Sequence, residues 1–376
     1  MVKVLKRPVK ALGFVVNPVA GMGGAVGLKG TDGRDVLERA LALGAIPVAP
    51  DRADTFLREL EPVKERVRLL VGAGKMGEGE AAKRGFSVAV VGDAKETTVP
   101  QDTKDAVAKM AEQGVKLLVF CGGDGTARDV LDAVGKGVPV LGVPTGVKMH
   151  SAVFAVDPRA AARMVMRFFW DGLPLKETEV MDVDEDAFRR GRVSAKLYGY
   201  VLTPYEPVLI QRSKVASVMT EGELRNQAAL AVYVIEEMVP DVVYVVGPGT
   251  TTRTIGDLLD EKKTLLGVDL FYNKKIIVKD ANEKRILEEI QGKPTKILVT
   301  PIGGQGFIFG RGNQQISPKV IRQVGRENII VIATRHKLAG LKTLRVDTGD
   351  PALDDELRGY MKVVIDYREE HVVKIS

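Results

Sequence analysis

The sequence predicts an α/β protein with two domains, and three observations lead to this prediction. The chain has 376 residues, which is long for one domain and sufficient for two. The part before Leu175 alternates short apolar runs with helical patterns, and the pattern changes after it. Near-continuous apolar strands between helices are typical of a parallel sheet covered on both faces. We therefore expect an N-terminal Rossmann-like parallel sheet with helices on both faces (residues 1–157) and a second domain, mixed α/β or β-rich (residues 158–376), whose C-terminal segment can return to the first.

The expected strands of the first domain are apolar runs that end in glycine, proline or polar residues. They are Leu12–Val16, Val67–Val71, Ser87–Val91, Leu117–Cys121 and Val138–Val143. The expected helices are Asp32–Leu43, Thr103–Gln113, Ala127–Val134 and Pro158–Trp170.

The second domain shows the same kinds of pattern with less regular spacing. Its expected strands are Glu177–Asp186, Leu197–Leu202, Asp241–Val246, Lys296–Thr300, Ile329–Ala333 and Val363–Asp366. Its expected helices are Glu221–Met238, Ser317–Val324 and Leu353–Gly359.

Composition and charge exclude several classes of protein. The 55 Lys and Arg against 49 Asp and Glu give a net charge of +6, spread along the chain. Such a diffuse excess suits phosphorylated ligands and does not indicate nucleic-acid binding. No apolar run reaches the length of a membrane span, and the charged N-terminus fits a first strand better than a signal peptide. The single Cys121 excludes a disulfide framework, and we expect a cytoplasmic homo-oligomer without membrane or nucleic-acid partners.

Glycine-rich turns recur where the expected strands of the first domain end. They are Gly21–Gly30, Gly72–Gly77, Gly122–Gly125 and Thr145–Gly146. Ligands of parallel sheets bind beyond the carboxyl ends of the strands, so this recurrence predicts a phosphate-bearing ligand.

The strongest motif is C-G-G-D-G-T-A-R-D-V, from Cys121 to Val130. Its glycines allow the backbone to approach a phosphate closely, and the N–H groups at the start of the following helix favour an anion. Beside a phosphate, Asp124 would bind Mg²⁺ or remove a proton. The alternative is a tight strand–helix turn in which Asp124 only caps the helix.

On these residues the chain resembles the superfamily of NAD kinases, diacylglycerol kinases and sphingosine kinases. Three further segments agree in order: N-P-V-A-G at Asn17–Gly21, G-V-P-T-G-V-K-M-H-S at Gly142–Ser151, and V-G-P-G-T-T-T-R-T-I at Val246–Ile255. The subfamily that it resembles most is ATP-NAD kinase of the AcoX type. The segments that carry this likeness are Gly27–Gly33, Glu179–Glu185 and Gly303–Gln315.

The resemblance implies roles for individual residues. Asp124 would activate the acceptor hydroxyl or organise Mg²⁺. Residues implied to bind the nucleotide are Asn17, Gly122, Gly123, Gly125, Thr126, Thr145, Gly146, Lys148, Thr250 and Thr251. NAD kinases also carry an Asn-Glu pair that grips the acceptor NAD, and the stretch where it is expected holds Arg225-Asn226-Gln227 instead.

The segment Gly303–Gln315 carries five glycines and one cation, Arg311. In one interpretation Arg311 clamps a phosphate, which its planar guanidinium suits, while Asn313 and Gln314 bind a ribose or an amide. The alternative is a flexible connection with a hairpin around Phe307–Phe309.

Two acidic residues suggest a cation site. On a strand Asp182 and Asp184 share one face and could hold Mg²⁺, whereas the alternative is a solvated acidic strand. His150 beside Lys148 could contact phosphate or simply be hydrogen-bonded.

Together these features predict an enzyme that transfers a phosphoryl group from ATP, with Mg²⁺, to a hydroxyl group of a small molecule. The resemblance makes NAD the leading acceptor, giving NADP, while a nucleoside, a polyol or a lipid stays open, as does the phosphate donor. A less favoured class is a nicotinamide-dependent oxidoreductase, because G-A-G-K-M-G at Gly72–Gly77 matches a dinucleotide fingerprint with Asp93 about 20 residues on. A third class is a regulator that binds ATP without turnover.

Overall fold

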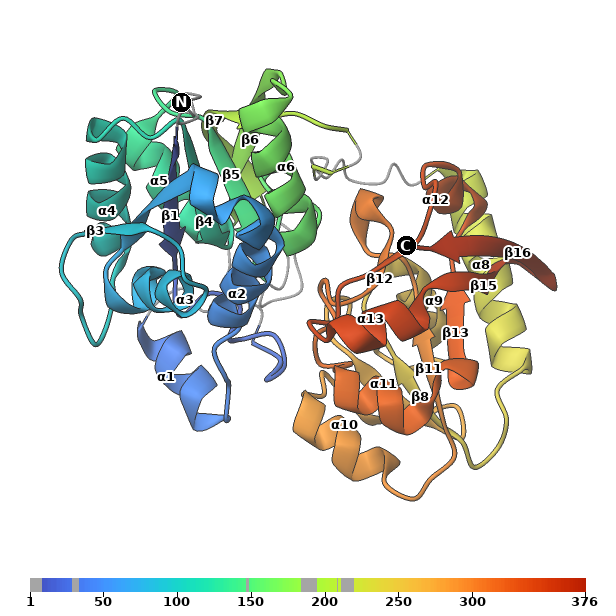
Figure 1. Ribbon diagram of the computed structural model, residues 1–376. Coiled ribbons are helices and arrows are strands. Elements are labelled where there is room, and N and C mark those ends of the chain that lie inside the picture. The colour runs from blue at the N-terminus through green and yellow to red at the C-terminus, as the bar shows by residue number, and fades with distance from the viewer. Residues whose placement is uncertain (1–8, 29–33, 147–148, 184–194, 208, 211–219) are drawn as a thin grey trace.

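The computed structural model describes residues 9–28, 34–146, 149–183, 195–207, 209–210 and 220–376. The chain forms two α/β units, drawn in blue to green and in yellow to red in Figure 1.

The first unit is built on a five-stranded sheet in the order β3-β2-β1-β4-β5, and all of its strand pairs are parallel. The strands are β1 (Lys10–Val16), β2 (Val67–Gly72), β3 (Val88–Val91), β4 (Leu117–Gly122) and β5 (Val140–Pro144). β4 is buried along its whole length, as expected for an interior strand of a sheet covered on both faces. The predicted Rossmann-like parallel sheet is confirmed.

Helices cover both faces of this sheet (Figure 1). They are α1 (Arg34–Ala42), α2 (Ala49–Leu60), α3 (Glu78–Lys83), α4 (Pro100–Glu112), α5 (Asp124–Val134) and α6 (Pro158–Trp170). α2 and α6 pack against one face, where Phe14 of β1 stacks on Phe56 of α2 with ring centroids 5.5 Å apart. α4 and α5 cover the other face.

The first unit continues past residue 157. Helix α6 shares the core of the first sheet. The antiparallel pair β6 (Leu175–Val183) and β7 (Ala195–Pro204) packs against α5 and β5. This packing favours a division of the chain after β7 rather than at residue 157.

The second unit is built on a seven-stranded mixed sheet in the order β10-β9-β8-β11-β13-β15-β16. Its strands are β8 (Val243–Val246), β9 (Asp269–Tyr272), β10 (Lys275–Val278), β11 (Thr295–Val299), β13 (Ile329–Ile332), β15 (Gly359–Asp366) and β16 (Glu369–Ile375). β8, β11, β13 and β15 run parallel, and antiparallel strands flank them, so that β10 and β16 are the edges. Because β16 pairs with β15, the C-terminal strand does not return to the first sheet.

Helices also cover both faces of the second sheet, which is therefore α/β rather than β-rich. α8 (Glu221–Glu236) and α9 (Thr250–Leu258) pack on one face, and α10 (Glu283–Ile290), α11 (Pro318–Val324) and α13 (Pro351–Leu357) on the other. Beside them lie α12 (Arg335–Ala339) and a short parallel pair, β12 (Phe307–Phe309) and β14 (Arg345–Val346).

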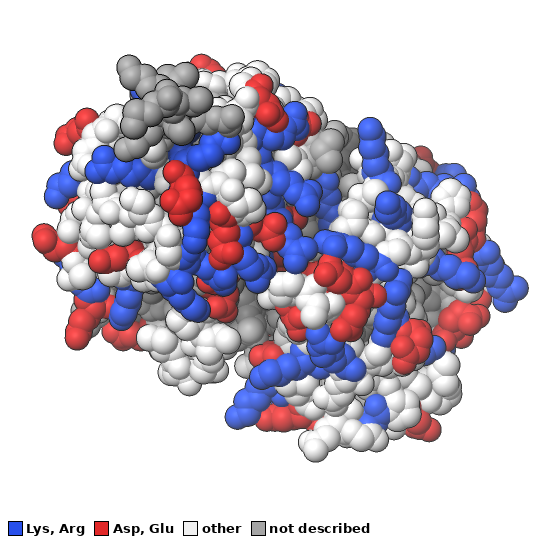
Figure 2. All heavy atoms as spheres, viewed as in Figure 1, with Lys and Arg blue, Asp and Glu red and all other residues white. Residues whose placement is uncertain are grey.

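The surface carries no single charged patch on the face shown in Figure 2, where basic and acidic side chains are interspersed over both units. Among the helices of the described residues, none combines the length and apolar character needed to cross a membrane.

Candidate active site

The loops that follow β1, β4 and β5 meet at the carboxyl edge of the first sheet. The backbone N–H of Asn17 donates to the carbonyl of Cys121 at 2.9 Å, and the N–H of Thr145 donates to the carbonyl of Gly122 at 3.2 Å. The Asn17 side-chain amide donates to Thr126 Oγ1 at 2.9 Å. The structure thus brings together the residues that the sequence predicted from three separate loops.

Glycine is required where these loops touch. A Cβ atom on Gly122 would lie 2.4 Å from the Thr126 side chain, and one on Gly21 would lie 2.1 Å from the carbonyl oxygen of Thr145. Gly21 also has a φ of +82°, which L side chains rarely adopt. Because glycine has no side chain, a phosphate can approach the backbone at this edge closely.

Asp124 is the first residue of α5, and its carboxylate is held by backbone donors from another segment. Oδ2 accepts the N–H of His150 at 2.7 Å, and Oδ1 accepts the N–H of Ser151 at 2.9 Å. Gly123 precedes the helix, and no side chain caps this helix end. Asp124 therefore does more than cap its own helix: its carboxylate binds the segment after β5 and has a fixed orientation at the carboxyl edge of the sheet. Its role in catalysis stays a prediction.

The second loop adds a polar group to this edge. Thr145 is buried, and within the described part of the chain its Oγ1 has no hydrogen-bond partner. A buried hydroxyl without a partner is costly unless a water or a ligand satisfies it. Gly146 lies against Gly123, while Lys148 lies outside the described residues.

Thr250 and Thr251 lie at the edge of the other sheet, at the start of α9. Gly249 precedes this helix with a φ of +132°, and Thr252 turns its hydroxyl back to the carbonyl of Gly247 at 2.8 Å. Thr250 is exposed and Thr251 is buried. Thr250 and Thr251 belong to the second unit, whereas Asp124 belongs to the first.

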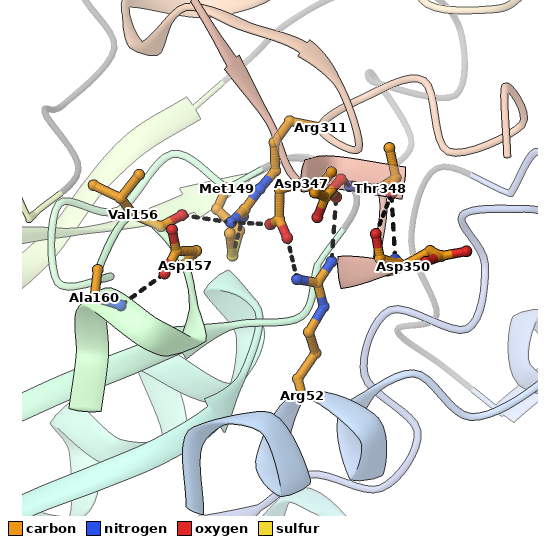
Figure 3. A network of polar contacts seen from close by, with 10 residues as sticks. Arg52, Met149, Val156, Asp157, Ala160, Arg311, Asp347, Thr348 and Asp350 are labelled. Carbon is orange, nitrogen blue, oxygen red and sulfur yellow. Dashed lines mark hydrogen bonds and ion pairs between the residues drawn. The ribbon is translucent and has the colours of Figure 1, made fainter. Parts of the chain in front are cut away.

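Arg311 is buried between the two units, as Figure 3 shows. Its Nη2 donates to the carbonyl of Val156 at 2.8 Å and pairs with Asp347 at 2.8 Å, and its guanidinium lies 5.0 Å from the ring centroid of Phe307. Asp347 also pairs with Arg52 of α2. The predicted role of Arg311 as a phosphate clamp is therefore wrong, because Arg311 is already bound to a carboxylate of the protein itself.

Electrostatics at this contact follow from burial and from the neighbouring charges. Burial lowers the pKa of the Arg311 guanidinium, and nearby Asp347 opposes that effect. Burial alone would raise the pKa of the Asp347 carboxyl, but Arg52 and Arg311 hold that pKa below its ordinary value. The carboxylate stays charged between two cations.

The rest of the segment Gly303–Gln315 is ordered by its own contacts. Asn313 is fully buried; its side-chain amide donates to the carbonyl of Ile308 at 2.8 Å and its Oδ1 accepts the N–H of Gly310 at 3.1 Å. Asn313 therefore closes a turn rather than facing a ribose. Phe307–Phe309 is not part of a flexible hairpin, because it forms β12 and pairs with β14. Gln314 keeps a buried Oε1 without a partner among the described residues, so its predicted contact stays open.

Two family models match the chain and together cover most of it. The model of the ATP-NAD kinase N-terminal domain matches residues 12–172, and that of the ATP-NAD kinase C-terminal domain matches residues 239–375. The chain belongs to the ATP-NAD kinase family. It is accordingly a kinase that phosphorylates a hydroxyl group. No curated protein matches the chain.

In this member of the ATP-NAD kinase family, the turn Gly72–Gly77 does not have the setting of a dinucleotide fingerprint. It follows β2 rather than the central strand β1, and the N–H of Gly74 already donates to the Glu78 carboxylate at 2.7 Å. A Cβ atom on Gly77 would lie 3.1 Å from the Phe14 ring. The geometry favours a glycine-rich strand–helix turn over a pyrophosphate site.

The cation site expected at Asp182 is not supported in the kinase. The Asp182 carboxylate pairs with Arg128 of α5 and is partly exposed, and Asp184 lies outside the described residues. Where side chains are described, no group of three or more His, Cys, Asp or Glu could hold a metal ion.

Sequence reasoning missed the backbone donors to Asp124 in the kinase site, and it missed an ion pair between the two units that lies outside that site. The N–H groups of His150 and Ser151 carry no sequence signal, because every residue except proline has one. Arg52 and Asp347 are 295 residues apart, and nothing in a single sequence pairs them.

Proposed function

We propose that this kinase transfers the terminal phosphoryl group of ATP to a hydroxyl of NAD and so forms NADP. The observation that carries the proposal is Asp124, fixed by the N–H groups of His150 and Ser151 at the ligand edge of the first sheet. The two ATP-NAD kinase models support the class of reaction. The AcoX type, the cytoplasmic location and the homo-oligomer stay predictions.

The loops give this edge what phosphoryl transfer needs, which is chiefly positioning and charge neutralisation. The proposed phosphate contacts are the backbone N–H groups of Gly123, Gly125 and Thr126, at the positive end of α5. Asn17, bound to Thr126, shapes the wall of this loop. We place Thr145 and Gly146 on the same nucleotide, since the Thr145 hydroxyl, which has no partner among the described residues, can donate to a phosphate oxygen.

Asp124 acts as the base in this proposal: it accepts the proton of the acceptor hydroxyl as the oxygen attacks the phosphorus. In the alternative role Asp124 would hold Mg²⁺ instead of taking the proton, since a carboxylate is the ligand type that this ion prefers. When bound, Mg²⁺ neutralises charge on the phosphate oxygens. Thr250 and Thr251, at the edge of the second sheet, remain proposed nucleotide contacts.

One observation favours an acceptor other than NAD. Asn226 stands where an Asn-Glu pair would grip NAD, and its side chain is already used: Oδ1 accepts the N–H of Arg335 at 2.9 Å and the amide donates to the carbonyl of Ile365 at 2.8 Å. A kinase of a nucleoside, a polyol or a lipid is therefore the second candidate.

The test is an acceptor screen with purified protein, Mg-ATP and, in turn, NAD, a nucleoside mixture, polyols and diacylglycerol. ADP is measured by chromatography and NADP by a dehydrogenase specific for NADP, with Asp124→Asn as the inactive control. NADP and ADP formed in equal amounts support the proposal. ADP formed only with another acceptor moves the function to the second candidate, and binding of ATP without ADP formation makes the protein a regulator.

A further inference from the structure

Arg311 touches the first unit at two points of one segment. Its Nη2 donates to the carbonyl of Val156 at 2.8 Å, and its Nη1 lies 4.0 Å from the sulfur of Met149 (Figure 3). Arg311 belongs to the second unit, whereas both contacts lie in the stretch that joins β5 to α6.

His150 and Ser151 lie between Met149 and Val156 in the sequence. Their N–H groups hold the two oxygens of Asp124 at 2.7 and 2.9 Å. One side chain of the second unit therefore binds both ends of the segment that orients the Asp124 carboxylate.

Other contacts tie the later part of this segment to its own unit. The N–H of Ala152 donates to the carbonyl of Glu179 at 2.8 Å, and the N–H of Ala155 donates to the carbonyl of Gly142 at 2.9 Å. Met149 precedes these bonds and lies between Arg311 and Gly146. The contact from Arg311 therefore acts on the end of the segment nearest to the Asp124 donors.

Arg311 is itself held firmly. Asp347 binds it at 2.8 Å, and Gly310 packs so closely that a Cβ atom there would lie 1.7 Å from the Asp347 carbonyl oxygen. Arg52 of α2 binds the same carboxylate from the first unit. Separating a buried ion pair leaves a charge without compensation. Arrangements in which Arg311 leaves Asp347 are therefore strongly disfavoured.

We propose that Arg311 is a positioning residue, which links the docking of the second unit to the orientation of Asp124. Asp347 holds Arg311, and Arg311 contacts Met149 and Val156. The segment between Met149 and Val156 in turn holds the Asp124 carboxylate. This inference rests on the proposed function, in which Asp124 accepts the acceptor's proton. Loss of Arg311 then lowers turnover more than it weakens the binding of either substrate.

The chain offers a matched control for this inference. Arg52→Met breaks the other ion pair between the units but leaves the contacts of Arg311 with Met149 and Val156 in place. Arg311→Met removes those contacts and leaves the Arg52–Asp347 pair intact. Arg311→Lys keeps the charge at the same site and can bind one of the two partners of Nη2.

Steady-state kinetics of the three variants, with whichever acceptor the screen identifies, give the first readout. A misplacement of about 1 Å can cost about 100-fold in rate, so we expect kcat of Arg311→Met to fall at least ~10-fold while both KM values change less than ~3-fold. Arg311→Lys recovers part of the loss, and Arg52→Met keeps kcat within ~3-fold of the wild type. Equal losses in Arg52→Met and Arg311→Met, or a rise in the acceptor KM alone, would overturn the inference.

Hydrogen exchange gives a second readout that needs no activity. We expect the peptide that contains His150 and Ser151 to exchange faster in Arg311→Met than in the wild type. In Arg52→Met its exchange rate should equal that of the wild type. A cooperative thermal transition in each variant shows that the variant is folded. Unchanged exchange in Arg311→Met refutes the positioning role. A wild type without kinase activity refutes the proposed function instead, and the exchange experiment still decides the role of Arg311.

Discussion

Replacing Asp124 by asparagine tests the catalytic assignment and the local geometry at once. The carboxylate accepts two backbone N–H groups, at 2.7 and 2.9 Å. An asparagine amide has one acceptor oxygen, so its NH₂ group must face the second N–H donor. Asp124→Asn therefore loses one hydrogen bond and weakens the other, because the remaining acceptor is neutral.

The magnitude follows from these two bonds. A hydrogen bond to a charged group contributes about 1.5–3 kcal/mol, and we expect the free energy of unfolding to fall by about 2 kcal/mol. For domains of this size 1 kcal/mol corresponds to about 2–4 °C, so Tm should fall by about 4–8 °C. Loss of the base should lower kcat at least ~100-fold.

The assay combines differential scanning calorimetry with initial rates of the acceptor reaction. Asp132→Asn, the same substitution on the exposed face of α5, is the control, because its bonds to Lys104 and Tyr198 lie at the surface, where such bonds contribute little to stability. A lower Tm with full activity would make Asp124 a structural residue. An unchanged Tm would refute the assignment of its two backbone donors.

Four further outcomes are expected. Gly122→Ala brings a Cβ to 2.4 Å from Thr126 and should cost about 1–3 kcal/mol in urea unfolding, whereas Gly123→Ala, whose Cβ has room, should not; equal stabilities contradict the packing. Mg-ATP at one hundred times its Kd should stabilise the protein by about 2.7 kcal/mol, and an unchanged Tm at millimolar Mg-ATP argues against the nucleotide site. Burial lowers the pKa of Lys263 from 10.5 to about 8, so the folded chain loses this proton first and stability rises between those pH values. Lys263→Met should make that rise smaller, and an equal rise in both proteins would show that the group titrates normally. Asn313→Ala leaves a buried N–H and a buried carbonyl unpaired, so the free energy of unfolding should fall by about 1–3 kcal/mol in the same urea series. An unchanged free energy of unfolding would favour a ligand-binding role for Gly303–Gln315.

Much of the fold could be predicted because buried parallel strands appear in a sequence as apolar runs. The five strands of the first sheet and helix α6 lie where these runs and caps predict them. Helix α2 was missed: Ala49–Leu60 begins with a proline in its first turn and carries charges throughout, so its apolar face is hard to recognise without the sheet it covers.

The site was predictable only in part, for physical reasons. Glycines beyond strand ends point to close backbone approach, and Asn17, Gly122 and Thr126 do meet. The partner of Arg311 was not predictable, because the chemistry that suits a phosphate also suits a buried carboxylate. Only the tertiary structure shows that Asp347, 36 residues further along, takes that place.

The two edges of the second sheet bear on how copies of this chain can associate. An edge strand presents unpaired N–H and carbonyl groups that could pair with another molecule, and lysines and other charges oppose such pairing. β10 begins with Lys275 and is followed by Lys279, and β16 exposes Glu370, His371 and Lys374. Both edges are thus protected against joining with the sheet of a neighbour. A homo-oligomer of this protein would then leave the second sheet complete within each subunit.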